Sequence, residues 1–274
     1  MHWQITFPGF SKISRASRLG VMAASLNCGR AKEKKMRKST FMLLLGLILL
    51  ASTLQHQAAF AGTSAEKLYA DPVNGQSIYS EGKGNAAACQ GCHGKKALGN
   101  DASGAPRLAN IGQIYTLKQL AEFATDKRIA FGAGATMNGI SKALNEQDRR
   151  DLVVYLDSLD YEIDSSDLKA LAPKKGNVGD PKKGRRIVTK GIKGLVPACQ
   201  NCHGLSGRPS NVPAIHQQKF VYIVNQLNSF RDGNRTNDPV AKDGGIMRGI
   251  AKKLTDENIA DIAAFLSTLR SLTP

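Results

Sequence analysis

The 274-residue chain has few side chains that bind metals or form disulfides: five cysteines, five histidines and six methionines. After residue 61 only the pairs Cys89/Cys92 and Cys199/Cys202 remain, together with three histidines and two methionines. A structural zinc site needs a second pair of ligands at set spacing within the same unit, and after residue 61 neither repeated unit has a further cysteine. This scarcity argues against zinc and concentrates the chemistry at very few positions.

A long hydrophobic run is also missing. The longest, 41–51, is much shorter than the roughly 20 apolar residues of a membrane-spanning helix, and Ser52, Thr53 and Gln55 follow it. It comes after the basic start "MRKST" at Met36 and before the small-x-small site 59–61, which are the parts of a secretory signal peptide. We therefore predict that 1–61 is a removed leader with its signal peptide starting at Met36, in preference to a retained membrane anchor. Residues 1–35 superficially match a transit peptide, but we favour Met36 as the true start.

Alternating runs of β-branched residues, which would indicate strands, extend over only a few positions. Helix signals are present instead. Asp71-Pro72 and Asp180-Pro181 combine an N-cap residue with a proline in the first turn. Asn145 and Thr255 are expected to cap the last helix of each half, and 259–269 carries apolar residues at three- and four-residue spacing. The sequence therefore predicts an all-α protein.

The chain repeats itself. "ACQGCHG" at 88–94 returns as "ACQNCHG" at 198–204, and the helix-like ends at 142–159 and 252–269 keep the same offset of 110. In between, five residues match at an offset of 107: Pro106, Tyr115, Leu120, Phe123 and Arg128 against Pro213, Tyr222, Leu227, Phe230 and Arg235. We predict two domains, 62–162 and 179–274, joined by a polar linker at 163–178. The matched tyrosines, leucines and phenylalanines are interpreted as a core helix face.

A histidine directly follows each CxxC, as His93 and His203. C-x-x-C-H is the attachment signal for covalent haem, whereas a redox pair or a disulfide has no use for that histidine. Thiols three positions apart can reach both vinyl groups on one edge of the porphyrin, and the next residue can direct its imidazole at the iron. We therefore predict two haem c groups, each attached through one cysteine pair, Cys89/Cys92 or Cys199/Cys202, with His93 and His203 as axial iron ligands.

The two methionines after the leader, Met137 and Met247, each lie 44 residues past a CxxCH histidine. Core packing gives no reason to restrict methionine to these two positions. A thioether is a soft neutral ligand, and His/Met ligation raises the reduction potential of haem iron. We predict that Met137 and Met247 are the sixth iron ligands, placed on loops whose small residues allow close approach to the haem. An iron with both axial positions filled favours electron transfer over catalysis.

Three weaker candidates remain. His216 has Ala109 as its counterpart and is interpreted as a surface residue. Pro106 and Pro213 follow their histidines by 13 and 10 residues, so their carbonyls could accept the second ring N–H of each ligand. Tyr79 is replaced by Val188 in the second copy and so cannot belong to the shared design.

The pattern "ACQGCHG…P…Y…L…F…R…M…L…DL…YL" resembles a class I cytochrome c, and two units in tandem resemble the cytochrome c4 family of two-haem periplasmic cytochromes. The resemblance covers 71–269 and implies two helical domains whose haems are close enough to exchange electrons. It implies thioethers at Cys89/Cys92 and Cys199/Cys202, proximal ligands His93 and His203, and distal ligands Met137 and Met247. His216 departs from the family, whose members usually have glycine there.

Charge is distributed unevenly. Residues 62–162 carry 11 Lys/Arg and 12 Asp/Glu, a net of −1, whereas 163–274 carry 18 and 9, a net of +9. This asymmetry predicts that the second domain is steered toward an acidic redox partner or an anionic membrane surface. The alternative is that the run of cations from Lys174 to Arg186 only solvates the linker. We do not expect nucleic-acid binding in an exported haem protein.

The sequence thus predicts a periplasmic electron carrier that is not itself an enzyme. It would move single electrons from a quinol-oxidising complex or a dehydrogenase to a terminal oxidase or reductase. One alternative is a tightly held cytochrome subunit of a periplasmic dehydrogenase that oxidises sulfide or alcohol, since tandem class I units also occur there. The last alternative, a two-haem peroxidase, would need an iron that can open.

Overall fold

A computed structural model describes residues 69–129, 135–204, 212–241 and 244–269. The predicted leader and signal peptide lie outside these residues. Thr63–Pro274 belong to one compact unit. Across the described residues, no helix is both long enough and apolar enough to cross a lipid bilayer.

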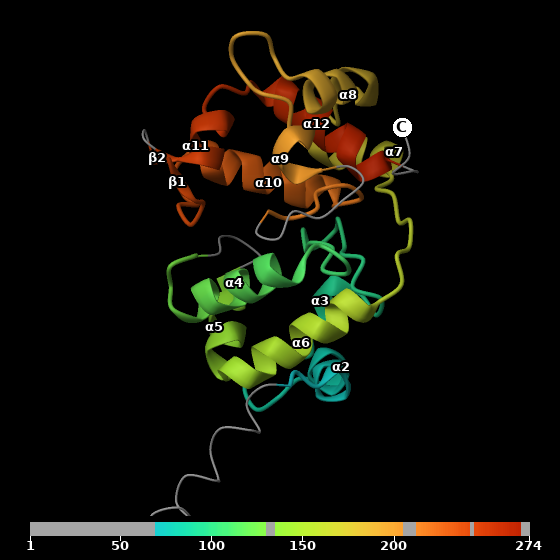
Figure 1. Cartoon of the computed structure of the whole chain (residues 1–274). Helices are drawn as coiled ribbons and strands as arrows, with labels where there is room; N and C mark the ends of the chain where they lie inside the picture. The colour runs from blue at the N-terminus through green and yellow to red at the C-terminus, as the bar shows by residue number, and fades with distance from the viewer. Residues whose placement is uncertain (1–68, 130–134, 205–211, 242–243, 270–274) are drawn as a thin grey trace, which may run out of the picture. The chain divides into compact units, whose positions relative to one another are not determined.

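The regular secondary structure of the described residues is almost entirely helical, and the helices follow the sequence repeat (Figure 1). The first half holds α2 (Pro72–Glu81), α3 (Gln90–His93), α4 (Gln113–Ala124), α5 (Thr136–Ala143) and α6 (Glu146–Ser158). The second half holds α8 (Pro181–Lys190), α9 (Gln200–His203), α10 (Phe220–Arg231), α11 (Ile246–Ala251) and α12 (Asp256–Thr268). The two short strands β1 (Val240–Ala241) and β2 (Gly244–Gly245) pair antiparallel before α11. The all-α prediction is confirmed.

The expected helix caps are present. Asp71 accepts a hydrogen bond from the backbone of Val73, and Asp180 accepts one from Lys182, each with proline in the first turn. Asn145 and Thr255 each form a capping box at the start of α6 and α12. Local sequence chemistry therefore sets where these four helices begin.

Each half has its own hydrophobic core. The core of the first half includes Ile78, Tyr79, Leu152 and Leu156 from α2 and α6. The core of the second half is larger, because α10 and α12 contribute Phe220, Ile223, Ile259, Ile262 and Leu266. The predicted stripe begins inside α12, where every residue from Ile259 to Ser267 is buried, and its last member, Leu269, follows the end of the helix.

In each half the first helix crosses the last one at a glycine. A Cβ on Gly75 of α2 would lie 2.1 Å from the carbonyl oxygen of Asp151 in α6, and one on Gly184 of α8 would lie 1.8 Å from that of Asp261 in α12. The same two aspartates accept the backbone N–H of Asp71 and Asp180 at 2.8 and 2.7 Å. Close backbone contact and a carboxylate clamp therefore fix the crossing of α2 with α6 and of α8 with α12.

The predicted linker, 163–178, contains a helix that the sequence analysis did not anticipate, α7 (Leu168–Lys175). Asp167 caps it by accepting from Lys169 and Ala170. Leu168 and Leu171 pack against the core of the second half. Two apolar residues three positions apart are enough to attach this short helix to the second half.

Candidate functional site

Each CxxCH segment forms a single helical turn. In α3 the backbone N–H groups of Cys92 and His93 both donate to the carbonyl of Cys89, at 3.2 and 3.0 Å. In α9 those of Cys202 and His203 donate to the carbonyl of Cys199 at the same two distances. Each turn thus presents two thiols and one imidazole from five consecutive residues.

The four cysteines predicted to attach haem are placed unequally. Cys89 and Cys199 are half-buried, and burial raises the pKa of each thiol to about 11. Cys92 and Cys202 are exposed. The helical turn directs its first cysteine toward the core and leaves its second at the surface of the chain. Attachment through Cys202, as through Cys92, therefore stays a prediction that rests on the motif and not on burial.

The imidazole of each turn forms a hydrogen bond with a proline carbonyl through its Nδ1. His93 Nδ1 lies 2.9 Å from the carbonyl oxygen of Pro106, and His203 Nδ1 lies 3.0 Å from that of Pro213. A carbonyl oxygen can only accept, so Nδ1 carries the proton in both rings and Nε2 keeps its lone pair. Burial lowers the pKa of both rings, against a smaller opposite effect of the carbonyl, so each is neutral at pH 7. The predicted proline–histidine contact is confirmed in both halves.

The two methionines occupy matching places. Met137 is the second residue of α5, and Met247 is the second residue of α11. Both side chains are half-buried. We expected loops at these positions; the structure instead starts a short helix there, which packs against α4 in the first half and against α10 in the second. Part of the stretch before Met137, residues 130–134, lies outside the described residues.

A polar seam joins the halves, and it consists of the matched residues Tyr115, Gln119 and Arg128 with Tyr222, Gln226 and Arg235. Arg128 donates to Gln119 of its own half at 2.7 Å and to the hydroxyl of Tyr222 at 3.2 Å. Arg235 does the reverse, donating to Gln226 at 2.6 Å and to the hydroxyl of Tyr115 at 3.1 Å. Matched residues of the two halves thus pack together, and each arginine donates to the tyrosine of the other half.

This seam corrects one interpretation of the matched residues. Phe123 and Phe230 are buried, as expected of a core face, and Arg128 and Arg235 stack on them at 4.5 and 4.4 Å. The tyrosines instead direct their hydroxyls to the other half. Burial by itself would raise the pKa of Tyr115, but the guanidinium groups of Arg235 and Arg128 lower it to about 8.

Two further residues differ between the halves. His216 was predicted to be a surface residue, and this is wrong: it is 7% exposed, and its ring lies 5.6 Å from that of Tyr161. The apolar context of a buried histidine is invisible in the local sequence. Tyr79, 1% exposed, donates from its hydroxyl to the carbonyl of Gly94 at 2.6 Å, and burial raises its pKa. Val188 fills the equivalent place in the second half and is completely buried.

The residues present fit haem c in both halves. Each CxxCH turn pairs its thiols with a neutral histidine whose free nitrogen is available to a metal, which is the ligand chemistry that haem iron requires. The fold and the duplicated site define a class of protein, the c-type cytochromes with one haem in each of two helical domains.

The comparisons with known proteins agree. The sequence model of the family described as cytochrome c matches residues 73–160 and 181–270. Cytochrome c4 of Pseudomonas aeruginosa is 33% identical over 193 residues, covering 69% of this chain and 87% of that protein. The thiosulfate dehydrogenase electron acceptor of Stutzerimonas stutzeri strain A1501 is 30% identical over 237 residues, covering 85% of this chain and 96% of that protein.

Solved structures extend the similarity. Reduced cytochrome c4 from Pseudomonas stutzeri superposes with a TM-score of 0.57 at 30% identity, covering 74% of this chain and all of that one. Thiosulfate dehydrogenase from Marichromatium purpuratum gives a TM-score of 0.62 at 25% identity, covering 73% of this chain and 40% of that one.

The chain belongs to the cytochrome c family and is a two-haem class I cytochrome resembling cytochrome c4. It carries two covalently bound haem c groups and transfers electrons. Its partners are therefore redox proteins.

Proposed function

We propose that this protein is an exported one-electron carrier of the periplasm, in which protein ligands fill both axial positions of each iron. The thioethers form at Cys89/Cys92 and Cys199/Cys202. His93 with Met137 holds the first iron, and His203 with Met247 holds the second. The observation that carries the proposal is the repetition of one design: a neutral histidine braced by a proline carbonyl, and a methionine at the second position of a helix packed on α4 or α10.

Bound haem supplies a one-electron couple, Fe(III)/Fe(II), and the chain sets its properties. The braced histidines keep one orientation and one tautomer. A neutral thioether favours the ferrous state and raises the potential. With both positions occupied by protein, an added ligand has no open coordination site, so the protein carries electrons and is not an enzyme.

Carbon monoxide tests the ligation directly. The reduced protein is expected to bind it slowly or not at all, whereas Met137→Ala opens the first haem to rapid binding and lowers the potential of that haem. Met247→Ala does the same for the second haem and serves as the matched control. Rapid binding by the unaltered protein would contradict the carrier and favour a peroxidase-like function.

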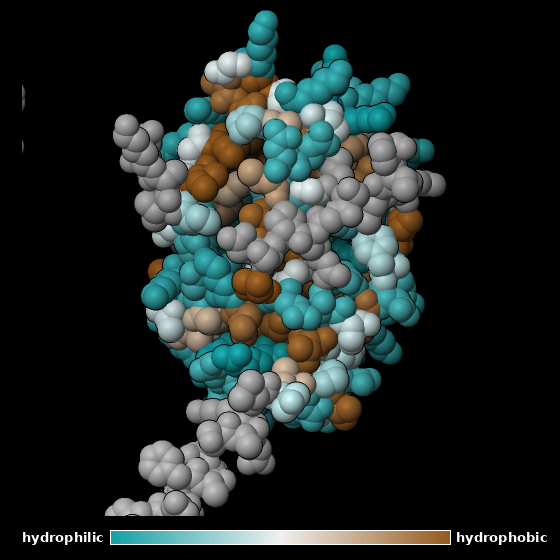
Figure 2. Space-filling model, in the orientation of Figure 1, coloured by the Kyte–Doolittle hydropathy of each residue, from teal (hydrophilic) through white to brown (hydrophobic). Residues whose placement is uncertain are grey.

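Exposed basic side chains line one helix of the second half. Lys182, Lys183, Arg185, Arg186 and Lys190 are exposed along α8. Figure 2 shows hydrophilic side chains over this helix. Because opposite charge speeds diffusional encounter, we propose that this helix attracts an acidic redox partner or an anionic membrane surface.

A dehydrogenase is the second candidate partner. Relatives from Stutzerimonas stutzeri and Thiomonas intermedia are named thiosulfate dehydrogenase electron acceptors. We propose that a periplasmic dehydrogenase of inorganic sulfur compounds donates electrons to this protein, either on encounter or as a permanent partner. Purification from the native host distinguishes these: co-elution with a catalytic subunit through high salt indicates a subunit, and elution alone indicates a diffusible carrier.

A further inference from the structure

The peptide group whose carbonyl accepts from each CxxCH histidine also forms a second hydrogen bond, through its N–H. The Pro106–Arg107 peptide accepts from His93 Nδ1 through its carbonyl, and its N–H donates 2.7 Å to Gln218 Oε1 of the other half. The Pro213–Ala214 peptide accepts from His203 Nδ1, and its N–H donates 3.1 Å to the carbonyl of Ile111 in the first half. Each half therefore binds the peptide that holds the CxxCH histidine of the other half.

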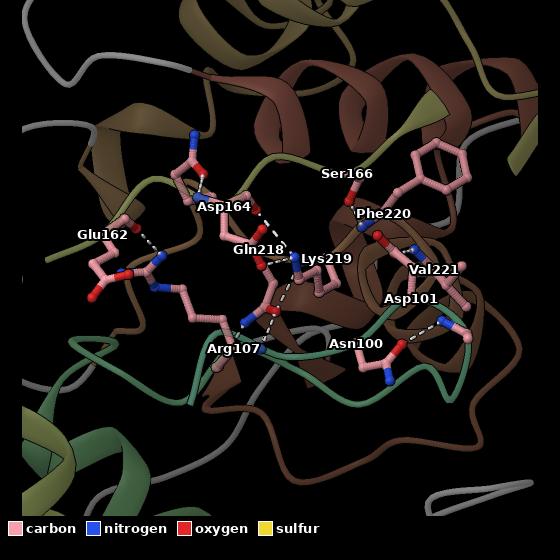
Figure 3. Close-up of polar contacts among 12 residues, drawn as sticks. Asn100, Asp101, Arg107, Glu162, Asp164, Ser166, Gln218, Lys219, Phe220 and Val221 are labelled. Carbon is pink, nitrogen blue, oxygen red and sulfur yellow. Dashed lines mark hydrogen bonds and ion pairs between the residues drawn. The ribbon is translucent and has the colours of Figure 1, made fainter. Parts of the chain in front are cut away.

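These two hydrogen bonds between the halves join residues that match in the repeat, but their acceptor groups differ chemically. Arg107 matches Ala214, and Ile111 matches Gln218, each at the offset of 107. One acceptor is a backbone carbonyl, which no substitution removes. The other is a side-chain amide, whose Nε2 also donates 3.0 Å back to the carbonyl of Arg107 (Figure 3). Only the brace of the first half thus depends on a side chain of the second.

Both ends of this contact are shielded from water. Arg107 is 1% exposed and Gln218 is 6% exposed. Hydrogen bonds in such surroundings polarise one another, so an acceptor at the N–H end of a peptide makes its carbonyl a stronger acceptor. A stronger acceptor on Nδ1 makes the histidine a more basic ligand, which favours ferric iron.

We propose that Gln218, in the second half, is a positioning residue for His93 in the first: it strengthens the Pro106 carbonyl and thereby lowers the reduction potential of the first-half haem. This role rests on the proposed ligation by His93. Because the proposed ligands are the same in both halves, this side chain at the contact between the halves contributes to the difference between the two reduction potentials.

The test uses the complete haem-loaded protein, with both potentials measured in one redox titration followed by NMR. The ring protons of His93 and His203 assign the signals of the two haems. Gln218→Met removes, at similar volume, all three side-chain hydrogen bonds: those with the N–H and the carbonyl of Arg107 and the one that Oε1 accepts from the N–H of Lys219. We expect the equilibrium constant for reduction of the first-half haem to rise about threefold, about 28 mV for one electron, while the second-half haem keeps its potential.

Gln217→Met is the matched control. Gln217 is 1% exposed and adjacent in the chain, but its Oε1 accepts from Asp164 and not from Arg107. It is expected to move neither potential. Gln218→Glu restores an acceptor oxygen for the Arg107 N–H and should hold the first-half potential at or below its original value. Gln218→Asn, which withdraws the amide by one methylene, replaces Gln218→Met if that variant fails to load haem.

The proposal is overturned if Gln218→Met moves neither potential, moves both equally, or matches Gln217→Met or Gln218→Glu. A separate observation would show that the proposed ligation by His93 is wrong. If the ring protons of His93 show no paramagnetic shift in the unaltered oxidised protein, then His93 is not the ligand, whatever Gln218 does.

Discussion

At the scale of single residues, the two halves show which positions the haem site requires and which only support the surrounding core. His93 and His203 have the same turn, the same tautomer and the same proline brace. Tyr79 and Val188 occupy one matched position with different chemistry, since only the tyrosine can donate to a carbonyl. The shared features are those that the proposed iron ligation requires, and the unshared hydroxyl contributes to packing.

Tyr79→Phe tests that distinction. Loss of the hydroxyl leaves the half-buried carbonyl of Gly94 without this donor, so the free energy of unfolding should fall by about 1 kcal/mol. The visible absorbance and both potentials should stay unchanged, because the neighbouring His93 keeps its own contact with Pro106. Denaturant unfolding and redox titration measure the two effects. A shifted first-half potential would mean that Tyr79 also acts on the haem.

At the scale of helices, the crossing of the first helix with the last determines how closely they approach. Gly75 and Gly184 lie against backbone atoms of α6 and α12 at distances that no side chain tolerates. Backbone carbonyls cannot rotate away as a flexible side chain would, so these contacts are rigid. The glycines are therefore required for packing, whereas their helix propensity is a disadvantage.

Gly184→Ala is expected to lower the free energy of unfolding by about 3 kcal/mol or more, since the added methyl must separate α8 from α12. Gly75→Ala should act similarly on the first half. Gly91→Ala is the matched control: a Cβ there meets nothing within 4 Å, and the second half has Asn201 at this position. It should change stability little. Equal effects at Gly91 and Gly184 would contradict the steric explanation.

At the scale of the whole molecule, the duplicated unit uses the same residues for two contacts. Arg128 and Arg235 stack on a phenylalanine of their own half and bind a tyrosine of the other. Gln218 and Ile111 exchange support for the histidine braces in the same way. Contact between the halves thus reaches the peptide that faces each CxxCH histidine, while positive charge is concentrated on the second half.

The positive charge of helix α8 predicts how the rate of electron transfer depends on the charge of the reaction partner. Lys182→Glu with Lys183→Glu should slow electron transfer from the reduced protein to hexacyanoferrate(III), an anion, by about threefold to tenfold at low salt. Transfer to a cationic cobalt(III) complex should become faster. Lys95→Glu with Lys127→Glu, exposed on the first half, makes the same change of charge as a control. Stopped-flow rates at several salt concentrations measure this, and equal effects of both pairs would refute a local docking surface.

Much of this protein could be predicted from sequence, because its signals are local or repeated. The capping residues Asp71, Asn145 and Thr255 act on neighbouring backbone, so their role does not depend on the rest of the fold. The CxxCH motif is equally local. The repeat at offsets of 110 and 107 shows the shared motifs twice, and it pairs Met137 with Met247. Carbon monoxide binding and the ring-proton shifts of His93 test the ligand assignments.

The sequence by itself determined the all-α class, the duplication and the haem-binding chemistry. Only the tertiary structure decided that His216 is buried, that Tyr115 reaches Arg235 and that Gln218 supports the brace of His93. The contacts of Tyr115 with Arg235 and of Gln218 with Arg107 join residues more than 100 positions apart. Spacing along a chain encodes the contacts of one turn or one helix face, but it does not encode which surfaces of two folded halves meet.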